Sequence, residues 1–167
     1  MSLSMYQASI PTFRRTLTSL AAILAKGAAH AEAKRIDPSV FLNARLAPDM
    51  FPLVRQVQIA SDAAKGAAAR LAGVKVPSYP DVETSFAELQ ERIAKTLAFF
   101  DGLDAAQFDG AETRSVTLKL RDREVTFNGL DFLFGFAVPN LYFHLTTTYN
   151  ILRHNGVELG KRDFLGA

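Results

Sequence analysis

An amide and an imidazole share the inward face of a predicted helix near the C-terminus, and they are the polar groups best placed for chemistry. Asn140 lies one turn before His144 in a stretch whose apolar residues recur at helical spacing. The inward positions are Leu133, Ala137, Leu141, His144, Thr148 and Ile151. Polar groups in a core need hydrogen-bond partners, so this face predicts either an internally satisfied polar pair or a ligand site.

Gln56, at the edge of the inward stripe of an earlier predicted helix, is the third candidate. It is either a solvated flank or a partner of Asn140 and His144. In the second case the three side chains form a neutral hydrogen-bonding cluster, suited to a small polar ligand or to ordered water. Divalent metals favour anionic or additional imidazole ligands, which this set lacks, so we predict no resident metal or other cofactor.

The remaining reactive side chains do not complete a second type of site. His30 and His154 lie at the ends of their predicted helices, and His154 is nearly three turns from His144, too far to share an ion. No serine or aspartate has the spacing of a catalytic triad with His144, and the chain has no cysteine. We therefore assign no catalytic residue. The alternative is a metal-dependent transferase or hydrolase in which His144 is one ligand and water or carboxylates supply the rest.

Composition predicts one soluble domain spanning residues 1–167. The chain is 49% hydrophobic and 22% charged, which is ordinary for a globular protein. The formal net charge is only +2 and the basic residues are scattered, so a nucleic-acid partner is not expected. No run of residues approaches a membrane span, and the first residues do not resemble a signal peptide. We expect a cytoplasmic protein.

The helix that carries the polar pair has clear signals at both ends. Asn128 is a suitable N-cap with Asp131 in the first turn, and Asn155-Gly156 suits a left-handed C-terminal cap. Pro139 lacks an N–H, so we expect a kink beside the polar pair.

Three further long helices are predicted upstream. The first runs to about His30, with a bend at Pro11; a connector over 32–49 follows, whose Phe41, Leu42 and Leu46 should tuck under the bundle. The second covers about 50–71 and closes at Gly73. Its alanine-rich half, AAKGAAARLA, allows close approach by another helix, either within the bundle or from a second subunit.

The third helix is predicted from about Pro80, a first-turn proline, to Phe100, with Asp101-Gly102 as its stop. The stretch 115–127 changes to an alternating pattern around the turn Arg121-Asp122, which predicts a β-hairpin lying on the bundle. Phe164 and Leu165 in the tail are predicted docking anchors. The fold class is therefore all-α: an up-down four-helix bundle with a small β-hairpin inserted before the last helix.

The closing segment PNLYFHLTTTYNILRHNGVELGKRDFLG resembles that of one branch of the DinB/YfiT-like superfamily of bacterial four-helix bundles, a branch described only as a domain of unknown function. The resemblance extends over essentially the full chain. The resemblance implies a helical bundle and a homodimer. The small-residue face of the second helix supports the same expectation of a homodimer.

Metal-binding members of this superfamily take one histidine from the second helix and two, four residues apart, from the last. On this sequence the second of that pair falls on His144, the first on Asn140, and the ligand of the second helix on Gln56. Two of the three positions hold amides, so the resemblance implies a degenerate metal site. We thus predict a small-ligand-binding or degenerate-site bundle.

Overall fold

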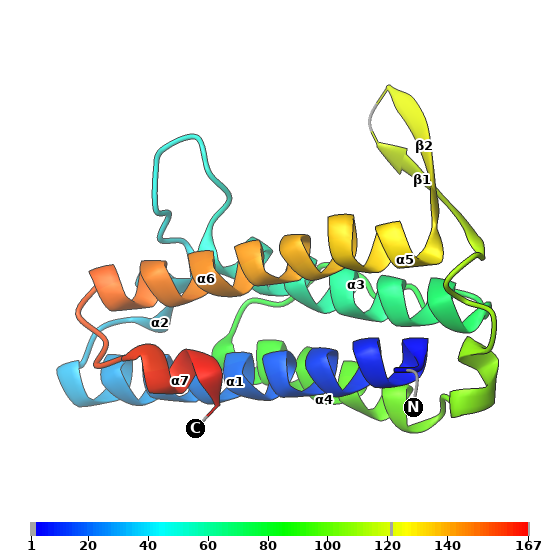
Figure 1. Cartoon of the computed structure of the whole chain (residues 1–167). Coiled ribbons are helices and arrows are strands. Elements are labelled where there is room, and N and C mark those ends of the chain that lie inside the picture. The colour runs from blue at the N-terminus through cyan, green and yellow to red at the C-terminus, as the bar shows by residue number, and fades with distance from the viewer. Residues whose placement is uncertain (1–2, 121, 167) are drawn as a thin grey trace.

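Four long helices form a bundle in the computed structural model, which describes residues 3–120 and 122–166. The long helices are α1 (Met5–Lys34), α3 (Leu53–Ala72), α4 (Phe86–Asp101) and α6 (Val138–His154). Helices α3 and α6 run side by side in one layer, and α1 and α4 in the other (Figure 1). The predicted all-α, up-down four-helix bundle is confirmed.

Shorter elements connect the long helices. They are α2 (Pro38–Leu42), the 3-10 turn η1 (Ala105–Phe108), β1 (Ser115–Leu120), β2 (Arg123–Asn128), α5 (Gly129–Phe132), the π-helical turn η2 (Leu133–Ala137) and α7 (Lys161–Leu165). The antiparallel hairpin stands before the last helix as predicted. One residue of its predicted turn, Arg121, lies outside the described residues. The hairpin and the loop between α2 and α3 project from the same side of the bundle (Figure 1). The hairpin thus contacts the rest of the chain mainly through α5, rather than lying on the bundle as predicted.

Apolar residues from all four long helices form one core cluster. On the last helix the predicted inward positions are all buried, and α3 buries Leu53, Val57 and Leu71. The alanine-rich half of α3 is itself largely buried within the chain. The small residues that could have served a second subunit are therefore already covered by the bundle.

The helix ends largely follow the sequence signals. A capping box between Ser4 and Gln7 starts α1, which contains Pro11 and continues to Lys34, one turn beyond the predicted end. Gly73 ends α3 in the left-handed region, with φ 71°, as predicted. With these boundaries, the apolar positions of each helix lie on the side that faces the core.

Helix α4 starts later than predicted. Ser85 is its N-cap and accepts a hydrogen bond from the Glu88 N–H, so Pro80 lies in the connector rather than in the first turn. The Arg92 guanidinium binds the carbonyl of Pro80 and the carboxylate of Glu83 and holds the connector against the bundle. Tertiary contacts to α4 therefore override the helix-start signal at Pro80.

Two predicted apolar anchors are exposed. Leu46 in the loop after α2 is 41% exposed, whereas Phe41 and Leu42 are buried as expected, because α2 forms in the connector and turns only these two inward. In the tail Phe164 packs between Tyr142 and Tyr149, while Leu165 is 50% exposed.

None of the described helices has both the length and the hydropathy that a bilayer crossing requires.

Candidate functional site

The helix that carries His144 is built in three parts. Asn128 caps α5 by accepting a hydrogen bond from the Asp131 N–H at 2.8 Å, as the sequence predicts. The π turn η2 then joins α5 to α6, and within it Val138 N–H donates to the Leu133 carbonyl. The interruption expected near Pro139 thus takes the form of a π turn, a wider turn that commonly occurs at functional sites.

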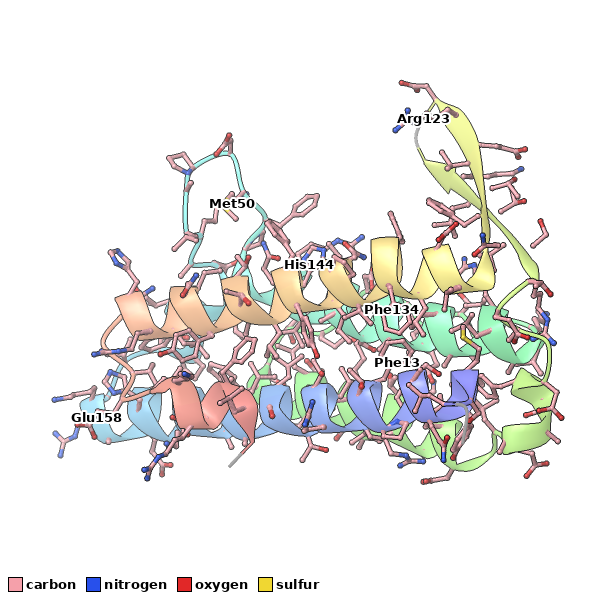
Figure 2. The ribbon with its side chains drawn as sticks, in the orientation of Figure 1. Phe13, Met50, Arg123, Phe134, His144 and Glu158 are labelled. Carbon is pink, nitrogen blue, oxygen red and sulfur yellow. The ribbon has the colours of Figure 1, made fainter. Side chains whose placement is uncertain are left out.

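His144 meets Gln56 between α6 and α3. Its Nδ1 lies 2.7 Å from Gln56 Oε1, and both side chains are buried. The Gln56 amide nitrogen in turn donates to the Phe51 carbonyl at 3.0 Å. Figure 2 shows His144 on α6 close to the base of the loop that carries Met50. The hydrogen bonds therefore link the last helix to the loop before α3.

These contacts fix the tautomer of the imidazole. The Phe51 carbonyl can only accept, so the Gln56 NH₂ points toward it and the Gln56 oxygen points toward His144. An oxygen acceptor requires a proton on Nδ1, which leaves Nε2 of the neutral ring as an acceptor. Among the described residues, the fully enclosed polar side-chain atoms without a partner are Ser19 Oγ and Arg92 Nε. His144 Nε2 therefore keeps some contact with solvent.

Burial lowers the pKa of His144 from 6.5 to about 4, and the positive charge of Arg55 contributes in the same direction. Arg55 itself forms an ion pair with Asp81 and a hydrogen bond with Gln58. The low pKa keeps the ring neutral at pH 7. The site thus offers an uncharged imidazole nitrogen acceptor, positioned by an amide.

The structure brings together two of the three sequence candidates. Asn140 lies one turn before His144 on α6 but is only half-buried, and among the described contacts its side chain forms no hydrogen bond with Gln56 or His144. The π turn and Pro139 place Asn140 near the edge of the inward face. The partner of His144 is Gln56 on another helix, not Asn140.

These donor groups do not fit a metal ion. Gln56 Oε1 accepts from His144 and its amide nitrogen donates to the Phe51 carbonyl, so both polar atoms of the glutamine already serve to hold the imidazole. No group of three His, Cys, Asp or Glu residues with metal-site geometry occurs in the described part of the chain. A single imidazole with a half-buried amide is too weak a ligand set for a divalent ion.

Two groups at the site were missed by the sequence reasoning. The carbonyl of Phe51 orients Gln56, and the Phe143 ring meets the His144 ring edge to face at 5.2 Å. The side chains of Phe51 and Phe143 are 54% and 55% exposed. The position of Phe143 next to His144 could be read from the sequence, but a backbone carbonyl that serves as a hydrogen-bond partner has no sequence signal.

Comparison with known proteins identifies the family. A family model described as "Domain of unknown function (DUF1993)" matches residues 5–165. A crystal structure of a DinB family member protein from Shewanella denitrificans matches with 45% identity and a TM-score of 0.88, covering 98% of this chain and 92% of that one. No curated protein matches the chain. The bundle with its inserted hairpin, built around His144 and Gln56, therefore belongs to the DUF1993 family, within the DinB-like superfamily.

Proposed function

We propose that this protein binds a small polar ligand that donates a hydrogen bond to Nε2 of neutral His144. The observation that carries the proposal is the 2.7 Å contact between His144 Nδ1 and Gln56 Oε1, which leaves Nε2 as an acceptor. A pKa of about 4 keeps this nitrogen unprotonated at neutral pH. A buried acceptor that retains solvent contact gains more from a ligand donor than an exposed one would.

The surroundings favour a ligand with an apolar body. Phe143 packs against the His144 ring, and both Phe143 and Phe51 are about half exposed. Binding sites commonly combine apolar walls with a few fixed polar groups. The arrangement supports binding more than catalysis, because the described contacts of the His144 ring, to Gln56 and Phe143, include no nucleophile and no carboxylate that would make it a general base.

Phenol and anisole form a matched pair of probes for this proposal. Both carry an aromatic ring, but only phenol has an O–H donor. In ¹⁵N-labelled protein at pH 7, phenol should shift the His144 Nε2 resonance saturably, whereas anisole should leave it in place. His144→Gln has no such resonance, so its response is followed on the backbone amides next to position 144, which should no longer shift saturably with phenol. The exposed neighbour variant Thr146→Ala should respond like the original chain. An Nε2 resonance that does not move with phenol would contradict the proposal.

A zinc titration of the same sample addresses the alternative, a metal-dependent transferase or hydrolase. The free lone pair on Nε2 is the one feature that favours it, since a metal-bound histidine also has its other nitrogen held by a hydrogen-bond partner. Stoichiometric zinc binding that abolishes the phenol response would support that alternative and overturn our proposal. Weak zinc binding that leaves the phenol response unchanged would favour the ligand site.

A further inference from the structure

A second concave site lies on α3, outside the His144 cluster. A cavity of about 320 Å³ lies between α3 and the connector that follows it. Its polar lining comes from Asp62, Lys65 and Arg70 on α3 and from Ser78 and Tyr79 on the connector. None of these groups takes part in the hydrogen bonds around His144.

Positive charge exceeds negative charge in this lining. Lys65 is buried, its Nζ lies 2.8 Å from Asp62 Oδ1, and it also stands 3.7 Å from the centre of the Tyr79 ring. The same carboxylate oxygen accepts from Arg92 at 2.9 Å. Arg92 lies outside the lining and also pairs with Asp81 and Glu83. Among the described residues that line the cavity, the charged groups are therefore Lys65 and Arg70 against the single carboxylate of Asp62.

Arg70 has no acidic partner among residues 3–120 and 122–166. The ion pairs of that part of the chain include Arg92, Arg55 and Arg14 but not Arg70, and no side-chain hydrogen bond is made by its guanidinium. Burial lowers the pKa of Arg70, which reflects the cost of holding a charge away from water. A bound anion would offset that cost.

Gly66 makes room for this guanidinium. A glycine inside a helix is less favourable than alanine, because it loses more backbone freedom on folding. A Cβ at Gly66 would lie 2.5 Å from Arg70 Nη1, and the other atom within 4 Å is Arg70 Cζ. No backbone of another element crowds the position. The glycine therefore lets the Arg70 side chain fold back along α3 to the cavity, at some cost in helix stability.

We propose that this cavity binds a small oxyanion of the phosphate class, either inorganic phosphate or the phosphate group of a monoester. Arg70 supplies a guanidinium fork, Lys65 a buried ammonium charge, and the Ser78 hydroxyl a further donor. The excess of one positive charge in the lining favours an anionic over a cationic ligand. Asp62, held between Lys65 and Arg92, keeps the ammonium group in place in the free protein.

Isothermal titration calorimetry with inorganic phosphate, in a low-salt buffer that contains no phosphate, tests the proposal. We expect saturable binding, at least tenfold weaker in Arg70→Gln. Arg14→Gln removes an arginine that is paired with Asp101 and does not line the cavity, so it should leave phosphate binding unchanged. Heat changes that do not saturate, or equal affinity in Arg70→Gln, would overturn the proposal.

Gly66→Ala separates binding from folding. The added methyl group displaces the guanidinium while improving helix propensity, so the variant should be as stable as the original chain or more stable, yet bind phosphate at least fivefold more weakly. Unchanged phosphate affinity in this variant would count against the role of Arg70. Glycerol phosphate in place of inorganic phosphate then distinguishes a monoester ligand, which should bind more tightly, from the free ion. Acetate, a flat monoanion, should bind at least tenfold more weakly than phosphate; equal affinity would exclude a phosphate-class site.

Discussion

His144 Nδ1 and Gln56 Oε1 lie 2.7 Å apart, although the two residues are 88 positions apart in the chain. The contact crosses from α6 to α3, and Gln56 continues it to the Phe51 carbonyl. It sets the tautomer of the imidazole, and so decides which ring nitrogen is available. The following predictions test the consequences of this arrangement.

Replacing His144 by Ala should destabilise the fold by about 1–3 kcal/mol, because it leaves Gln56 Oε1 without its donor and opens a cavity between α3 and α6. A urea melt followed by circular dichroism gives the change in midpoint and slope. Thr146→Ala, an exposed position on the same helix, should change the midpoint little. An unchanged midpoint in His144→Ala would exclude a structural role for the pair.

The pKa of His144 predicts an acid-dependent loss of stability. The unfolded ring titrates near 6.5 and the folded ring near 4, so in the folded state the neutral form is favoured. The contribution of the neutral ring to the free energy of unfolding is fully present above the unfolded pKa. It is lost as the pH falls from about 6.5 toward 4, because in this interval only the unfolded chain binds the proton. The loss should be on the order of 2–3 kcal/mol. Urea melts at pH 7, 5.5 and 4.5 should show it, and His144→Ala should lose less over the same interval.

Gln56→Glu should reverse the protonation of the ring. A carboxylate next to Nδ1 stabilises the imidazolium, so the pKa of His144 should rise, and its Nε2 should change from acceptor to donor at neutral pH. The pH titration of the histidine resonances by NMR measures this directly. A pKa that stays at about 4 would show that burial outweighs the new charge, and phenol should then still bind.

Protein purified without chelator should contain far less than one zinc, nickel or iron per chain. The reason is the set of donor groups: one imidazole and a half-buried amide, with the glutamine already engaged. Elemental analysis of dialysed protein is the measurement. About one transition metal per chain would contradict the degenerate-site reading and favour the metal-dependent alternative.

We expect a symmetric homodimer, but through a different face from the one that the sequence suggested. The small residues of α3 are buried in the bundle, whereas Phe134 in the π turn η2 is 53% exposed. Phe134→Asp should therefore lower the mass seen by sedimentation equilibrium. Val82→Asp, at an exposed apolar position in the connector, should not. A single-chain mass for the original protein at all concentrations would refute the dimer.

The sequence by itself determined the bundle and much of its detail. Helical periodicity selected the buried faces, Asn128 and Gly73 marked helix ends, and the change to alternation at β1 located the hairpin. These features are local, because each depends on residues within a few turns of one another. They were predictable for that reason.

Tertiary structure decided the start of α4 and the partner of His144. Pro80 has a helix-start signal, but its carbonyl binds Arg92 twelve positions away. Asn140 has the right spacing to pair with His144, yet the hydrogen bond goes to Gln56, because the packing of α6 on α3 brings that amide closer. Periodicity gives the face of a helix but not which atoms on a neighbouring helix lie opposite. That pairing depends on how the helices pack, and so does the cavity formed by Arg70, Lys65 and the connector.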